Sequence, residues 1–107
     1  MTHIMTVTGK KPLADLGKTL VHEHVLVGFP GWFLDSRFPK FQRDEALVRA
    51  IAAFQQLKDY GVATVIDPCP SDLGRDVEFI AEVSSGSGVQ LICAAGLYFE
   101  AAGLSYT

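Results

Sequence analysis

The sequence predicts an α/β fold built on parallel strands. Two continuous apolar runs of strand length, 62–66 and 89–95, are typical of strands that are buried on both faces. A segment with apolar residues at helical spacing precedes each run. Strands that alternate with helices favour parallel pairing through right-handed crossovers. The expected order is strand, long loop, helix, strand, helix, strand.

The first of these strands carries a His-x-His pattern. Residues 6–9 and 18–20 flank a turn-rich segment with Pro12 and Gly17, which predicts a small hairpin leading into the apolar run 20–27. Within this run the sequence reads His22, Glu23, His24. Side chains alternate along a strand, so the two histidines are predicted on one face and the glutamate on the other.

Two imidazoles on one strand face can hold one divalent ion at about 2.0–2.1 Å. The alternative from spacing alone is a pair of hydrogen-bonded core histidines, which would be unfavourable to bury without partners. Glu23 is predicted to face the helix layer in a structural role, paired with Arg49 or Arg75.

Residues 28–41 form a long loop rich in glycine, proline and aromatic residues. Long ordered loops are often functional, and these aromatic side chains either wall an apolar pocket or cover one end of the core. Asp44 is then predicted to cap a helix that ends at Gly61. One face of this helix carries Leu47, Ala50, Ile51, Phe54 and Leu57.

The second half of the chain repeats the pattern of strand and helix. Asp67–Pro70 ends the strand 62–66, because proline cannot continue a central strand. A shorter helix is predicted over 75–84, followed by a turn at 85–88 and the strand 89–95, which Gly96 stops. The apolar face of that helix is expected to carry Val77, Ile80, Ala81 and Ser84, with Phe79 and Val83 on its flank.

The carboxyl ends of parallel strands are where chemistry gathers in α/β folds. In this chain the segments 22–24, 67–71 and 96–100 fall there. Asp67 is a candidate ligand by position, although a role in organising its loop is the favoured interpretation. Asp72 and Asp76 are expected at the start of the second helix. Cys69 and Cys93 are expected to be reduced, buried thiols rather than ligands, because neither lies in a ligand-spaced pair.

Composition limits the possible partners. The chain has 107 residues and a net charge of −3. It has no basic stripe for nucleic acid, no apolar stretch that would span a membrane and no signal peptide, so a cytoplasmic location is expected. Three parallel strands would leave two open sheet edges, and the chain is therefore expected to be the first part of a larger domain.

Four segments together resemble the amino-terminal part of the phosphotriesterase family in the amidohydrolase superfamily, and they are especially similar to the phosphotriesterase-like lactonases. These segments are 17–24, 61–68, 73–77 and 95–99. The resemblance implies a (β/α)₈ TIM barrel, of which residues 1–107 would be the amino-terminal part, with the first three strands and an incomplete barrel.

The resemblance also implies a site with two divalent metal ions at the carboxyl face, zinc above cobalt, iron or manganese. His22 and His24 would bind the more buried ion, and the remaining ligands would lie beyond residue 107. Tyr98 matches the tyrosine that lactonase-like members place near the reacting centre, which favours a lactone or similar ester as substrate.

The implied function is hydrolysis of lactones or of phosphotriester and carboxylic esters by water activated between two metal ions. Intact, the protein would be a homodimer, whereas the chain alone would be inactive, since a catalytic zinc needs three ligands from the protein. The alternative is a non-enzymatic product, either a truncated remnant or a module that folds against a partner.

Overall fold

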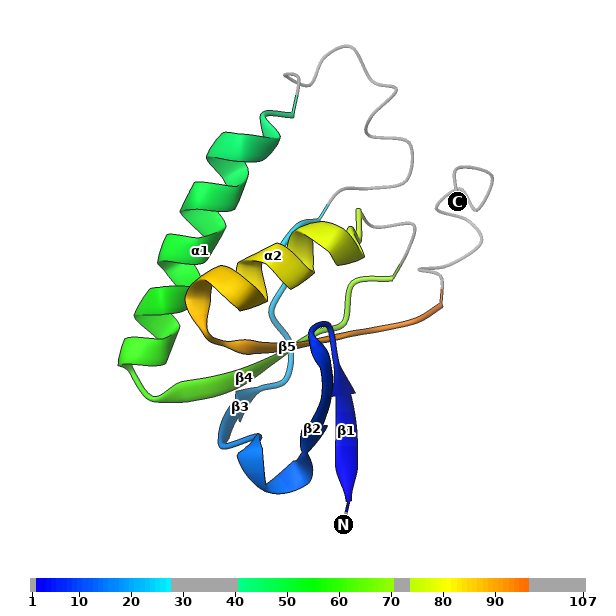
Figure 1. The fold of residues 1–107 in the computed structure, drawn as a ribbon. Coiled ribbons are helices and arrows are strands. Elements are labelled where there is room, and N and C mark those ends of the chain that lie inside the picture. Colours follow the sequence, from blue (N-terminus) through cyan, green and yellow to red (C-terminus); the bar gives the residue numbers. More distant parts are fainter. Residues whose placement is uncertain (1, 28–40, 71–73, 97–107) are drawn as a thin grey trace.

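The computed structural model describes residues 2–27, 41–70 and 74–96. Its elements form a small α/β unit with two helices over a parallel sheet and a hairpin beside it (Figure 1). In chain order they are β1 (His3–Thr6), β2 (Gly9–Pro12), a short 3₁₀ turn (Leu13–Asp15), β3 (Lys18–Leu20), α1 (Arg43–Asp59), β4 (Val62–Asp67), α2 (Val77–Ser87) and β5 (Gln90–Cys93).

The parallel sheet confirms the predicted fold class. Its strand order is β3-β4-β5, and both pairings are parallel. Leu20 lies opposite Val65 in the first pair, and Asp67 lies opposite Cys93 in the second. The carboxyl ends of all three strands therefore lie at the same edge of the sheet, as parallel β/α units require.

The central strand, β4, is buried along most of its length. Val62, Thr64, Val65 and Asp67 are each buried, so both of its faces are covered. The hydroxyl of Thr64 donates a 2.6 Å hydrogen bond to the carbonyl of Leu16, which satisfies this polar group inside the core. The segment before β3 is thereby tied to the middle of the sheet.

Both helices lie on the same side of the sheet (Figure 1). The predicted apolar face of α1 is confirmed: Phe54 is buried, and Leu47, Ala50 and Leu57 pack against the core cluster. Helix α2 contributes three fully buried side chains to the core, those of Phe79, Ile80 and Val83. At Gly86 the helices approach so closely that an added Cβ would lie 2.6 Å from Ile51 Cδ1, so a larger residue there would force the Ile51 side chain to move.

The hairpin at the amino terminus forms from other residues than predicted. β1 pairs antiparallel with β2, with Thr6 opposite Gly9, whereas the sequence placed one arm at 18–20. The reason is the tight turn at Val7–Thr8, closed by a hydrogen bond from the Thr6 hydroxyl to the Gly9 carbonyl. Residues 18–20 are instead taken by the parallel sheet, and the hairpin attaches to it through Val7 N–H, which donates to the Leu91 carbonyl at 2.8 Å.

Helix α2 begins and ends later than the predicted range of 75–84. Asp76 caps it, accepting a 3.0 Å hydrogen bond from the Phe79 amide. The helix continues to Ser87 and ends at Gly88, whose φ of +79° is a left-handed C-cap. Val77, predicted on the apolar face, is 45% exposed, because Phe79 and Val83 take the core-facing positions.

Removing the cap of α2 should lower stability. Asp76→Ala leaves the Phe79 amide without its acceptor, and we expect the free energy of unfolding to fall by about 0.5–2 kcal/mol. The matched control is Glu78→Ala, which removes an acidic side chain from the same first turn without removing a cap. Urea denaturation of both variants measures the difference, and equal losses would contradict the capping role.

The predicted aromatic residues of the loop at 28–40, Asp72 and Tyr98 lie outside the described residues. Within the described ranges, neither helix is long and apolar enough to cross a membrane.

Candidate metal centre

His22 and His24 lie just beyond the carboxyl end of β3. The sequence placed them inside a strand, and this prediction is wrong: β3 ends at Leu20, and residues 21–26 follow it as an irregular segment. Their rings nevertheless meet, with centroids 5.2 Å apart and planes at 86°, an edge-to-face arrangement. The predicted proximity of the two imidazoles is therefore present without the strand geometry.

Beyond the end of β3, a side chain replaces one of the backbone partners. Glu23 N–H still donates to the carbonyl of Ile66 in β4, at 3.3 Å. Two residues later, Val25 N–H donates instead to Oδ2 of Asp67, at 3.0 Å. Side-chain acceptors of this kind compete with the ladder of backbone hydrogen bonds. The chain consequently bends along the end of β4 and brings His24 to the Asp67 carboxylate.

The separation of the two histidine rings can be compared with that expected for a shared divalent ion. Imidazoles bound to one tetrahedral zinc at about 2.0–2.1 Å have ring centres about 5 Å apart. The observed separation of the ring centroids is 5.2 Å. His22 is exposed, and the side chain of His24 is 29% exposed, so an ion can reach this place from solvent.

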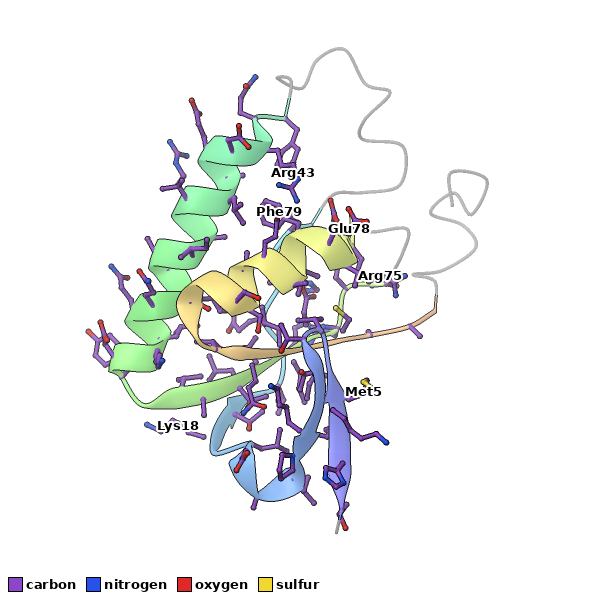
Figure 2. The ribbon with its side chains drawn as sticks, viewed as in Figure 1. Met5, Lys18, Arg43, Arg75, Glu78 and Phe79 are labelled. Atoms are coloured by element: carbon purple, nitrogen blue, oxygen red, sulfur yellow. The ribbon has the colours of Figure 1, made fainter. Side chains whose placement is uncertain are left out.

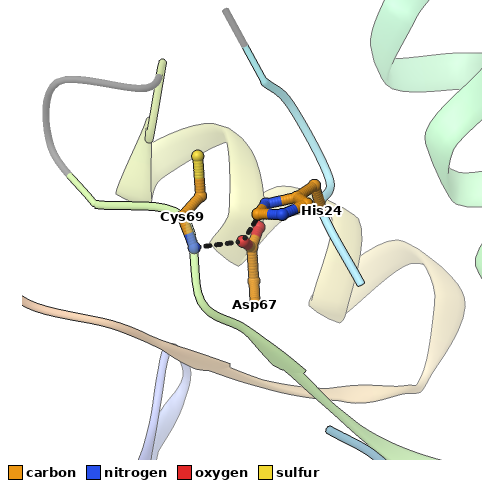
Figure 3. Close-up of side chains that lie close together, drawn as sticks. All are labelled: His24, Asp67 and Cys69. Atoms are coloured by element: carbon orange, nitrogen blue, oxygen red, sulfur yellow. Dashed lines mark hydrogen bonds and ion pairs between the residues drawn. The ribbon is translucent and has the colours of Figure 1, made fainter. Parts of the chain in front are cut away.

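Asp67 organises this edge of the sheet. It ends β4, is 1% exposed, and accepts a hydrogen bond from the amide of Val25. It also accepts one from the amide of Cys69 (Figure 3). Its Oδ1 also lies 3.3 Å from Nδ1 of His24. Its own carbonyl accepts from Ala94 N–H at 3.1 Å, which joins the end of β5 to the same place. The predicted organising role of Asp67 is confirmed.

Both cysteines are thiols, and the prediction for them is confirmed in part. Cys69 is fully buried, whereas Cys93 is only half-buried. Cys69 Sγ lies 3.4 Å from the carbonyl of Leu26. It also lies near His24 and Asp67, where one ligand atom from each residue falls within 4.8 Å of the others.

Burial raises the pKa of the Cys93 thiol, and the charge of Asp67 raises it further, so Cys93 stays protonated near neutral pH.

Glu23 does not have the surroundings that the sequence predicted. Its side chain is exposed rather than turned into the helix layer, because the segment after β3 is irregular. Water therefore solvates the carboxylate, and no buried partner is needed. The guanidinium of Arg75, one of its two predicted partners, donates to the carbonyl of Ala94 at 2.5 Å. Arg75 thus supports the end of β5 rather than Glu23.

The pairing of His24 with Asp67 is the feature that sequence reasoning missed. A signal for it was present, because both residues follow neighbouring parallel strands and the ends of such strands share an edge. What could not be read from the sequence is the bend after Leu20, which turns His24 toward β4. Tyr98, the third predicted site residue, lies outside the described part of the chain.

Comparison with known proteins identifies the family of this chain. A family model described as "Phosphotriesterase family" matches residues 2–106. An aryldialkylphosphatase of Saccharolobus solfataricus is 32% identical over 85 residues, which are 78% of this chain and 26% of that protein. A phosphotriesterase homology protein of Mycobacterium tuberculosis is 35% identical over 100 residues, 92% of this chain and 30% of that protein. The chain thus spans less than a third of the length of these relatives.

Solved structures give the same result for the fold. A variant of a PTE-like lactonase from Deinococcus radiodurans superposes with a TM-score of 0.88 at 40% identity, covering 94% of this chain and 31% of that one. An organophosphorus hydrolase from the same organism superposes with a TM-score of 0.87 at 40% identity, covering 92% and 30%. These neighbours are TIM barrels, and the parallel β/α units described here match part of such a barrel.

Proposed function

Since the chain belongs to the phosphotriesterase family, we propose that residues 1–107 are the amino-terminal part of a single barrel domain that hydrolyses esters with two divalent metal ions. The observation that carries the proposal is the meeting of His22 and His24 at the carboxyl edge of the parallel sheet. The proposed substrates are lactones or phosphotriester and carboxylic esters. Relatives named as an aryldialkylphosphatase and as a PTE-like lactonase support this class.

His22 and His24 are the residues that would hold one of the ions. Imidazole nitrogens suit zinc, cobalt and iron, and zinc is the proposed metal. When bound, two divalent ions would lower the pKa of a bound water molecule and would polarise the oxygen of the ester under attack. The chain itself contributes the two imidazoles and, through Asp67, a fixed position for the segment that carries them.

Tyr98 is the residue proposed to contact the substrate. The resemblance to lactonase-like family members supports this assignment and favours a lactone. A phenolic hydroxyl there would donate a hydrogen bond to the substrate oxygen and orient the ester. The homodimeric assembly and the cytoplasmic location stay predictions from the sequence.

A hydrolysis assay tests the proposal. The intact protein that contains residues 1–107, loaded with zinc, should hydrolyse an aliphatic lactone or an aryl phosphotriester. A chelator should abolish the activity and added zinc should restore it. The chain of 107 residues should show no turnover by itself, since two histidines are fewer than the three protein ligands of a catalytic zinc.

Glu23→Gln is the matched control, because this exposed residue lies between the two histidines and should keep full activity. Absence of metal-dependent hydrolysis in the intact protein would contradict the proposal and favour the non-enzymatic alternative.

A further inference from the structure

Asp67 is a buried carboxylate that binds three groups of the candidate metal centre. Oδ2 accepts from the Val25 amide at 3.0 Å, and Oδ1 accepts from the Cys69 amide at 2.9 Å. Oδ1 also faces Nδ1 of His24 at 3.3 Å (Figure 3). Because the side chain is 1% exposed, water does not compete for these oxygens. The carboxylate is therefore held rigidly, and it can in turn hold the imidazole.

We infer that Asp67 is a positioning residue that selects one tautomer of His24. A carboxylate accepts hydrogen bonds, so the Asp67 carboxylate favours a proton on the imidazole nitrogen that lies 3.3 Å from it. That nitrogen is Nδ1, which leaves the lone pair of Nε2 for a metal ion. The inference rests on the proposed function, in which His24 is a metal ligand, and it adds the group that orients this ligand.

A second use of the same residues is direct ligation by His24, Asp67 and Cys69, whose possible ligand atoms lie within 4.8 Å of one another. Two contacts speak against it. Oδ1 of Asp67 already accepts from the Cys69 amide, and the Cys69 thiol donates toward the Leu26 carbonyl at 3.4 Å. A thiolate at this fully buried place would lose that hydrogen bond and lie near a carboxylate. The geometry therefore favours positioning over ligation.

Asp67→Asn is the variant that separates these roles. The amide keeps the size of the carboxylate but has one accepting oxygen and one donating NH₂ group. If NH₂ takes the place of Oδ1, it faces His24 and favours the tautomer with the proton on Nε2. If it takes the place of Oδ2, it opposes the Val25 amide and disturbs the segment that carries His24. In either orientation, the variant no longer holds Nε2 of His24 unprotonated and in one fixed position for a metal ion.

Cys69→Ser is the matched control. Serine keeps the backbone amide that binds Asp67 and a hydroxyl that can donate to Leu26, but it removes the soft sulfur ligand. If Asp67 acts by positioning His24, this variant should behave as the unmodified chain does. If the three residues ligate an ion directly, the variant should lose affinity for zinc.

Long-range ¹H–¹⁵N correlation spectra of the metal-free chain test the inference directly. We expect the neutral His24 imidazole to carry its proton on Nδ1 in the unmodified chain and to lose this single preference in Asp67→Asn, where both tautomers should be populated. Titration with zinc should show a Kd raised about 10–100-fold in Asp67→Asn and unchanged in Cys69→Ser.

Two results would overturn the positioning role. One is an Nε2–H tautomer of His24 in the unmodified chain, a measurement that requires no variant to fold. The other is a loss of zinc affinity in Cys69→Ser as large as that in Asp67→Asn. Neither result depends on the hydrolysis assay. If the intact protein lacks hydrolytic activity but His24 carries its proton on Nδ1, the proposed function is contradicted and the positioning role of Asp67 is not.

Discussion

Phe79→Ala should lower the free energy of unfolding by about 3–5 kcal/mol, the range for removing a large buried aromatic side chain. Phe79 is fully buried in α2 within the main hydrophobic cluster. Its ring lies 6.2 Å from that of Phe41, and the guanidinium of Arg43 lies 5.4 Å from its centroid (Figure 2). Arg43 also pairs with Glu82 on α2, so the aromatic ring lies under a contact that joins the two helices.

Tyr60→Ala is the control for Phe79→Ala, because this aromatic side chain is 80% exposed at the end of α1. Its loss should change stability by less than about 0.5 kcal/mol. Guanidinium chloride denaturation measures both variants. Since a domain is stabilised by about 5–15 kcal/mol in total, the loss at Phe79 should shift the midpoint strongly. A change below that of Tyr60→Ala would contradict the assigned core.

His22→Ala and His24→Ala should each weaken zinc binding by more than about 100-fold, since the loss of a ligand exceeds the effect of losing its outer-shell partner, which is about 10–100-fold. The side chain of His22 is exposed, so His22→Ala should change stability without metal little. His24→Ala also removes the imidazole beside the buried Asp67 carboxylate, so its stability without metal is measured alongside. At a zinc concentration of about one hundred times Kd, the unmodified chain should gain about 2.7 kcal/mol of stability, and both variants should lose most of this gain.

His3→Ala is the matched control for these variants. This third histidine lies in β1, opposite Pro12 of β2 and outside the metal centre, so its removal should leave zinc affinity unchanged. Calorimetric titration measures the zinc affinity of all three variants, and thermal melts measure their stability. Equal affinities in the three would show that His22 and His24 do not form the site.

Periodicity predicts the core of this fold well because burial acts on every residue of an element. The run 62–66 is the buried central strand, and the helical spacing of Leu47, Ala50 and Phe54 gives the packed face of α1. The first and last residues of helices and strands are predicted less well, because a single hydrogen bond can determine where an element begins or ends. Asp76 moves the start of α2.

The same distinction applies to the candidate site. The His-x-His pattern predicts that two imidazoles lie together, and they do. The strand geometry behind that prediction is wrong: β3 ends at Leu20, and the Asp67 carboxylate takes the place of a backbone acceptor for the Val25 amide. A bond between a side chain and a backbone 42 residues away has no local signature in the sequence. The exposure of Glu23 follows from the same bend.

X-ray absorption at the zinc edge of the zinc-loaded chain would identify the atoms that bind the metal. The structure and the proposed role of Asp67 predict nitrogen and oxygen neighbours at about 2.0–2.1 Å, with the outer-shell scattering of two imidazoles from His22 and His24. A sulfur neighbour at about 2.3 Å would show that a cysteine, Cys69 or Cys93, is a ligand and would contradict this arrangement. A spectrum without imidazole scattering would contradict the assignment of both histidines.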